Sequence, residues 1–238
     1  MDLEGMTAFV AGGGAGVWPA VARRLAADGA GVMVCTPDEE QARAAEAELT
    51  ARGVPAYCLA ADPVRPREVE TALGELLRVF GALDVAVADL TARPAGGLLD
   101  VDEATFETTL AADLRAAFGV AQRAARLMVA RGRGGSIVLV ADSLVDDGGR
   151  RSLAGDTCAG ALERMTRALA HELGAHGVRV NLVRGQTGPA HEPLPAFPLG
   201  RPATADEVAA AVAFLAGPRS SYVSGATLLV DAGLEAVR

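Results

Sequence analysis

This sequence contains no lysine, so a lysine cannot transfer protons in any reaction that the protein catalyses. Carboxylates are the side chains that could do so instead. All 22 positively charged residues are arginines, so no lysine can act as a Schiff base, a general base or a phosphate anchor. Asp113 and Asp142 could form a pair with separated pKa values, one acting as general acid and the other as general base in a dehydration, isomerisation or cyclisation. The alternative is that both acids line a solvated cleft with no catalytic role.

Two further residues could take part in chemistry. His191 lies in a proline-rich stretch, residues 188–198, and could carry protons, although a solvated loop residue is the simpler interpretation. Cys158 would need a basic neighbour to act as a nucleophile, so a small buried thiol is the simpler interpretation there. The aspartates lack the spacing of a metal site, and we expect no metal.

A glycine-rich segment could bind phosphate. Residues 11–19 read AGGGAGVWP and lie between a short apolar run and a helical stretch. In a dinucleotide-binding turn, glycines such as Gly12 and Gly16 allow the backbone to approach a pyrophosphate. The alternative is that the turn only packs the first helix and binds no ligand.

The elements that must position these residues alternate along the chain. The predicted strands are Thr7–Val10, Gly31–Cys35, Ala56–Ala60, Leu83–Val87, Ser136–Val140, Val178–Val183 and Thr227–Val230. The predicted helices are Pro19–Asp28, Glu39–Arg52, Pro66–Phe80, Phe106–Arg131, Ala159–His176 and Ala205–Ala216. Such alternation predicts an α/β fold, a doubly wound parallel sheet of seven strands with helices on both faces, formed by residues 1–238 as one domain.

Composition excludes several classes of protein. The 238 residues carry a net charge of −8, which argues against a nucleic-acid partner because phosphate binding needs clustered positive charge. No apolar run reaches the roughly 18 residues of a membrane span, and the N-terminus is acidic where a secretory signal would be basic. The three cysteines have no paired spacing. We therefore expect a cytoplasmic protein that binds no membrane.

From end to end, the sequence resembles the short-chain dehydrogenase/reductase family. Gly12 and Gly16 fall on the first two glycines of that family's cofactor turn, Trp18 falls on the third, and Asp62 matches an aspartate that contacts adenine. Further matching segments are Phe80–Val85, Gly134–Val138, Thr166–Leu173, Gly177–Asn181, Ser220–Thr227 and Val230–Gly233. The resemblance implies a Rossmann-type fold and NAD(P)-dependent redox chemistry.

The residues that carry this chemistry in the family are replaced. Counting back from Asn181 puts Gly155 at the family's catalytic tyrosine and Ala159 at its lysine. Asp142 lies at the serine position, with Ser143 one residue later, and Asp113 lies at the asparagine. A positioned proton donor is worth roughly a hundred- to ten-thousand-fold in rate, so we expect standard redox turnover to be lost.

The resemblance also implies changes in the cofactor cleft. Ala88-Asp89-Leu90-Thr91 replaces the family's Asn-Asn-Ala-Gly, and Arg184 replaces a proline that borders nicotinamide. Carboxylates near the pyrophosphate would repel it, and Trp18 is bulky where a glycine is usual. We therefore expect no bound cofactor, or NAD(P) bound weakly through Gly12, Gly16 and Asp62.

Three functions remain open at this stage. The first is a catalytically degenerate, redox-silent subunit that partners an active paralogue. The second is a non-redox acid–base enzyme that acts on a small molecule through Asp142 and Asp113. The third is an atypical NAD(P)-dependent oxidoreductase. The alanine-rich helices Phe106–Arg131 and Ala159–His176 predict a dimer or tetramer, formed with itself or with the paralogue.

Overall fold

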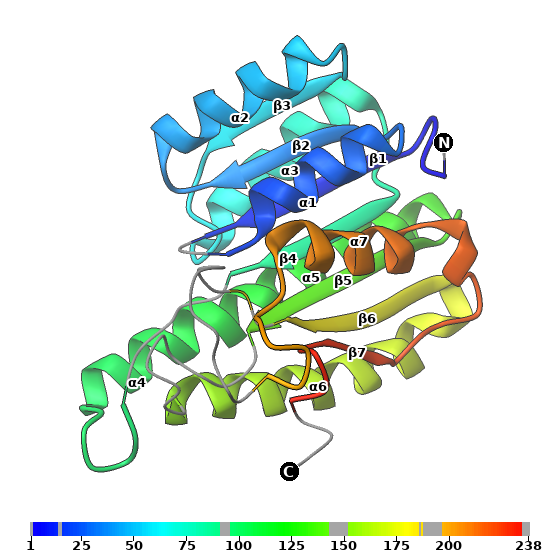
Figure 1. Cartoon of the computed structure of the whole chain (residues 1–238). Coiled ribbons are helices and arrows are strands. Elements are labelled where there is room, and N and C mark those ends of the chain that lie inside the picture. The colour runs from blue at the N-terminus through cyan, green and yellow to red at the C-terminus, as the bar shows by residue number, and fades with distance from the viewer. Residues whose placement is uncertain are drawn as a thin grey trace.

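The structure is a computed structural model that describes residues 2–13, 16–90, 96–142, 152–185, 187 and 197–234, with the backbone alone for Asp142 (Figure 1). Its strands form one seven-stranded sheet in the order β3-β2-β1-β4-β5-β6-β7, and every neighbouring pair is parallel. The strands are β1 (Thr7–Gly12), β2 (Gly31–Thr36), β3 (Ala56–Ala60), β4 (Val85–Asp89), β5 (Gly135–Asp142), β6 (Val178–Gly185) and β7 (Thr227–Val230). The predicted doubly wound α/β fold is confirmed.

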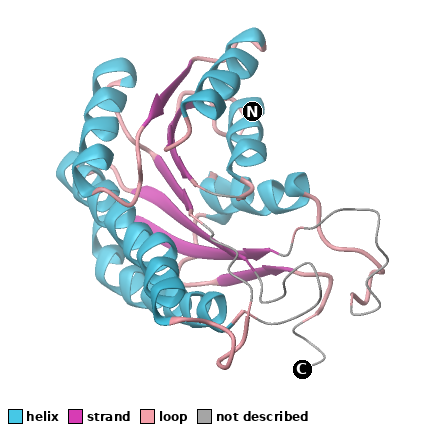
Figure 2. Ribbon diagram, turned by 90° about the vertical axis from the view of Figure 1, so that its left-hand side faces the viewer, coloured by secondary structure: helices cyan, strands magenta, loops and turns pink. Residues whose placement is uncertain are grey.

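Helices cover both faces of the sheet (Figure 2). The α-helices are α1 (Trp18–Ala27), α2 (Glu39–Ala51), α3 (Pro66–Phe80), α4 (Glu103–Thr109), α5 (Ala116–Arg131), α6 (Leu153–Leu173) and α7 (Ala205–Ala216). Shorter turns are η1 (Leu110–Arg115), η2 (Gly174–His176) and η3 (Pro218–Ser220). One core cluster joins the sheet to α3, α5 and α6, and the other joins it to α1, α7 and part of α2.

Strand residues alternate between these two cores. In β5, Ile137 and Leu139 pack toward α5 and α6, whereas Val138 and Val140 pack toward α7 and α1. Because both faces are buried, the strands are continuous apolar runs, which is how they were recognised in the sequence.

Two helical boundaries differ from the prediction. The helix predicted over Phe106–Arg131 is divided into α4, the π-helical segment η1 and α5. The helix predicted to begin at Ala159 begins at Leu153, because the Ser152 hydroxyl accepts a hydrogen bond from the Gly155 amide at 3.1 Å and caps the first turn. Both differences lie beside the candidate site.

In the part of the chain that the structure describes, no helix is both long enough and apolar enough to cross a membrane.

Candidate functional site

The carboxyl ends of the central strands bring the predicted site residues to one edge of the sheet. Gly12 at the end of β1 is in register with Asp89 at the end of β4, and Asp142 at the end of β5 is in register with Gly185 on β6. The strand order reverses between β1 and β4, and open parallel sheets bind ligands at such a point, outside the carboxyl ends.

The Trp18 indole is part of the core and does not fill the cleft. Its side chain is only 2% exposed and lies directly over Gly12, where an added Cβ atom would come within 2.2 Å of the indole Cγ. The expectation that this residue weakens cofactor binding by its bulk is therefore wrong, because the ring is directed into the sheet–helix packing. Gly12 must be a glycine to accommodate this packing, whether or not a ligand binds.

A buried carboxylate lies against the glycine-rich turn. Asp89 is almost fully buried, and a Cβ atom added at Gly16 would lie 2.5 Å from its Oδ2. The Gly13 amide donates a hydrogen bond to the Asp89 carbonyl at 3.1 Å. The structure thus places a carboxyl group beside the turn, and in its ionised form this group opposes a phosphate there.

The first turn of α1 nevertheless fits an anion. Val17 occupies its N-cap position, and a valine side chain cannot accept hydrogen bonds from the first helical amides. Those amides and the positive end of the helix dipole are the usual partners of a dinucleotide pyrophosphate. The backbone therefore fits a pyrophosphate, while the carboxylate of Asp89 weakens the fit.

Asp62 lies just beyond β3, at the same edge. Its Oδ1 accepts a hydrogen bond from the Val64 amide at 2.9 Å, and its Oδ2 lies 3.3 Å from Nε of Arg65. The side chain stays partly exposed. One carboxylate oxygen of Asp62 can therefore accept a hydrogen bond from an adenine amino group while the other accepts the hydrogen bond from the Val64 amide.

Asp113 lies within the π-helical segment η1 and is only 7% exposed. Such segments are rare and occur frequently at functional sites. The neighbouring Cys158 thiol is buried and lies 3.9 Å from the Thr109 carbonyl oxygen. Burial, with a smaller contribution from the Asp113 charge, raises the pKa of Cys158 to about 12, so this thiol is not a nucleophile at neutral pH.

The positions predicted for tyrosine and lysine lie on the first turns of α6. Gly155 is engaged in the helix cap, and Ala159 is buried. One turn further along α6, the Glu163 carboxylate accepts a hydrogen bond from Nη1 of Arg184 at 2.7 Å. Sequence reasoning missed Glu163, although its spacing of four residues from Ala159 places both on one helix face.

Some predicted residues lie outside the described part of the chain. These are His191, Ser143 and the side chain of Asp142. Within the described residues, no group of three or more His, Cys, Asp or Glu side chains could hold a metal ion.

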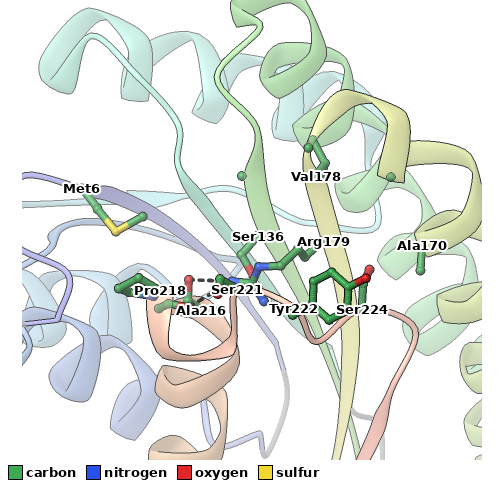
Figure 3. A pocket seen from close by; sticks show the side chains of 14 residues that line it. Met6, Ser136, Ala170, Val178, Arg179, Ala216, Pro218, Ser221, Tyr222 and Ser224 are labelled. Atoms are coloured by element: carbon green, nitrogen blue, oxygen red, sulfur yellow. Dashed lines mark hydrogen bonds between the residues drawn. The ribbon is translucent and has the colours of Figure 1, made fainter.

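A separate pocket of about 560 Å³ opens at the amino edge of the sheet (Figure 3). Its central cation, Arg179, donates hydrogen bonds to four acceptors and so is fully engaged by the protein. The acceptors are Ser220 Oγ and the carbonyl oxygens of Ala216, Gly217 and Val223. This pocket lies at the opposite end of the strands from the predicted site residues.

The strand order, with its glycine-rich turn between β1 and α1, defines a Rossmann-type α/β fold. More narrowly, the chain belongs to the short-chain dehydrogenase/reductase family. The matching family model, described as enoyl-(acyl carrier protein) reductase, covers residues 13–235.

Full-length relatives carry the names of redox enzymes. The chain is 30% identical to L-rhamnose 1-dehydrogenase (NAD(P)(+)) from a Sphingomonas species, over 98% of this chain and 97% of that one. It is also 30% identical to bovine L-xylulose reductase, over 98% of both chains. Among solved structures, a short-chain dehydrogenase from Burkholderia cenocepacia in complex with NADP is 33% identical, with a TM-score of 0.87 over 99% of this chain and 100% of that one.

These relatives correct the functional prediction. The hypotheses of a redox-silent subunit and of a non-redox acid–base enzyme are wrong, because relatives that match the chain from end to end are named as dehydrogenases, two of them with NAD(P)(+) in the name. The expectation of no cofactor is likewise unsupported, since solved relatives hold NADP. The error was to equate missing residue types with missing chemistry: carboxylates also transfer protons, and backbone amides bind pyrophosphate without any side chain.

Proposed function

We propose that the protein is an NAD(P)-linked oxidoreductase that interconverts a hydroxyl group and a carbonyl group on a small polar molecule. The observation that carries this proposal is the end-to-end match to L-rhamnose 1-dehydrogenase, which covers 98% of this chain. Sorbitol dehydrogenase and L-xylulose reductase, both matched over 98% of this chain, support a polyhydroxylated substrate.

The dinucleotide site of this proposal is formed mainly by backbone. The amides at the start of α1 bind the pyrophosphate, Gly12 and Gly16 border it, and the Asp62 carboxylate meets the adenine. When bound, the dinucleotide supplies the hydride acceptor or donor. The Asp89 carboxylate makes dinucleotide binding weaker than it would be with a neutral side chain at this position.

Carboxylates hold and move the substrate proton. In the oxidation direction, the substrate hydroxyl gives its proton to a carboxylate, the carbon that bears this hydroxyl loses a hydride to the oxidised dinucleotide, and the C=O double bond forms. Asp113 on η1 is the first candidate for this proton-accepting carboxylate, and Asp142 at the end of β5 is the second. His191 stays a prediction as a further proton carrier.

Calorimetry with NAD⁺, NADH, NADP⁺ and NADPH tests the cofactor, followed by nicotinamide absorbance with a panel of sugars and polyols. We expect at least one dinucleotide to bind with a Kd below about 1 mM and at least one polyol to be oxidised. Failure of all four dinucleotides to bind at millimolar concentration would overturn the proposal.

We also propose that the chain forms a homodimer or a homotetramer. An apolar groove of about 470 Å³ is lined by residues of α4, η1, α5 and α6, and one of them, Phe118, is 44% exposed. Glu107 and Arg115 are among its lining residues, so a two-fold axis across the groove would pair each with the opposite charge of the second copy.

Light scattering at low micromolar concentration tests the assembly. We expect a multiple of the 24.2 kDa chain mass, and we expect Phe118→Arg to lower it. Leu99→Arg, at a 96% exposed leucine that does not line the groove, is the matched control and should leave the mass unchanged. A wild-type protein with the mass of one chain would contradict the proposal.

A further inference from the structure

The indole of Trp18 occupies the space that a side chain at position 12 would need. Gly12 is the last residue of β1, and Trp18 is the first residue of α1. A Cβ atom added at Gly12 would lie 2.2 Å from Cγ, 2.5 Å from Cδ1 and 2.6 Å from Cδ2 of the indole. Rotation about the Cβ–Cγ bond of Trp18 leaves Cγ in place, so turning the ring does not relieve this overlap.

The missing side chain of Gly12 would point toward the core on the side of α1. Side chains alternate between the two faces of a strand, and Ala8 and Val10 of β1 both pack in the core cluster that contains Trp18. Gly12 continues that row. Its φ angle lies outside the left-handed region, so the backbone there suits an alanine as well. The glycine at this position is therefore required by the indole.

This contact helps to fix the start of α1, where capping does not. The N-cap residue Val17 makes no side-chain hydrogen bond to the first helical amides, and Trp18 next to it is almost fully buried. Elsewhere in the turn, the Gly13 amide donates a hydrogen bond to the Asp89 carbonyl at 3.1 Å, and the Asp89 carboxyl group lies against Gly16. The end of β1 is thus held to α1 through Trp18, and the turn is held to β4 through Asp89.

We propose that Trp18 is a positioning residue: by resting on Gly12, its indole fixes the first turn of α1 so that the helix amides meet the dinucleotide pyrophosphate. This inference rests on the proposed function. A site that already has its bound geometry before the ligand arrives loses less conformational entropy on binding. Trp18 need not touch the dinucleotide, because it acts through the backbone amides next to it.

A double-mutant cycle between the two positions tests this role. Gly12→Ala forces a Cβ atom into the indole, so NAD(P)H affinity should fall by about tenfold or more. Trp18→Ala removes the support of the helix start and should also weaken binding by about tenfold. The double variant contains no overlap, so its affinity should be no lower than that of Trp18→Ala. Fluorescence titration of NAD(P)H measures each dissociation constant.

Hydrogen exchange of the Gly13 amide reports the position of the turn without any ligand. Its bond to the Asp89 carbonyl protects it, and exchange in a turn follows local opening. The exchange rate should rise by about tenfold in Gly12→Ala and in Trp18→Ala, and it should be no higher in the double variant than in Trp18→Ala. Trp18→Phe keeps a ring at this position and should stay near wild type in both measurements.

Gly135→Ala is the matched control at the other edge of the sheet. Gly135 is the first residue of β5, and a Cβ atom added there would lie 2.5 Å from Sδ of Met128. The same substitution therefore strains the core without touching the turn. Affinity for NAD(P)H and exchange of the Gly13 amide should both stay at their wild-type values.

The outcomes separate this inference from the proposed function. Wild-type affinity and wild-type exchange in Gly12→Ala would overturn the role of Trp18, and so would a double variant that is worse than Trp18→Ala. If Gly12→Ala fails to fold, a double variant that folds and binds supports the role, and one that also fails to fold overturns it. Wild-type protein that binds no dinucleotide but shows the expected exchange rates would overturn only the proposed function.

Discussion

The two ends of β6 carry arginines in opposite settings. Arg179, near the start of the strand, points toward α7 and donates to carbonyl and hydroxyl oxygens at the end of that helix (Figure 3). Arg184, five residues later, lies on the face of the strand that packs on α6 and pairs with the carboxylate of Glu163. Arg179 donates hydrogen bonds to carbonyl oxygens at the end of α7 and so stabilises the fold. Arg184 forms an ion pair at the edge of the sheet that also holds Asp89.

Polar groups therefore have different roles at the two edges of the sheet. Those at the amino edge stabilise the fold, whereas those at the carboxyl edge are available for function. At the amino edge, the groups around Arg179 are neutral, and burial lowers its pKa without a carboxylate to oppose the effect. At the carboxyl edge, Asp89 ends β4 and Asp142 ends β5. Charges that are not needed to close a helix end are the ones available for chemistry.

The largest expected effect is at the carboxyl edge. Asp113→Asn should reduce turnover by about a hundredfold or more, because an amide cannot take the substrate proton. The thermal midpoint should change little, since asparagine has nearly the same shape. Asp206→Asn, at a largely exposed position on α7, is the control and should keep full turnover. Equal activity of Asp113→Asn and wild-type protein would remove Asp113 from the mechanism.

At the amino edge, the expected effect is on stability alone. Arg179→Met leaves buried carbonyl oxygens at the end of α7 without their donor, which should cost about 2 kcal/mol of unfolding free energy. Chemical denaturation measures this loss. Dinucleotide-dependent turnover should stay at its wild-type value, because Arg179 lies at the opposite edge of the sheet from the candidate site. A large fall in the turnover of the folded variant would contradict the purely structural role of Arg179.

A smaller effect is expected where the glycine-rich turn meets Asp89. Asp89→Asn removes the negative charge beside Gly16 and keeps the shape, so NAD(P)H affinity should rise by about tenfold. Asp62→Asn should act in the opposite sense and weaken binding. Fluorescence titration of NAD(P)H measures both. An unchanged or weaker affinity of Asp89→Asn would show that its carboxylate does not oppose the pyrophosphate.

The smallest effect concerns the end of α7 that is farther from Arg179. The Arg201 side chain, followed by the Thr204 amide, holds the pKa of Glu207 near 2, well below its ordinary value of 4.5. This stabilisation is present above about pH 4.5 and is lost as the pH falls toward 2. Glu207→Gln should therefore flatten the pH dependence of the thermal midpoint in this window. If the thermal midpoint of Glu207→Gln had the same pH dependence as that of the wild-type protein, the stabilising role of the Glu207 carboxylate would be contradicted.

Much of the fold could be predicted from local patterns. Continuous apolar runs such as Val178–Val183 indicated strands buried on both faces, and the structure extends this one only to Gly185. The π-helical segment η1 could not be predicted, because it depends on packing against α6 and not on residue preferences. The start of α6 was missed because the cap at Ser152 lies seven residues before the first residue of the predicted helix.

Less of the site could be predicted, and the reason is distance along the chain. The sequence by itself determined which residue types are present, including the absence of lysine, and the order of strands and helices that brings Gly12, Asp89 and Asp142 to one edge. Only the tertiary structure decided that Trp18 covers Gly12 and that Asp89 lies against Gly16. It likewise decided that Arg184 reaches Glu163, 21 residues away. Backbone periodicity is a local property that a sequence displays directly, whereas side-chain pairing between distant segments follows from how the packed helices and sheet fill space.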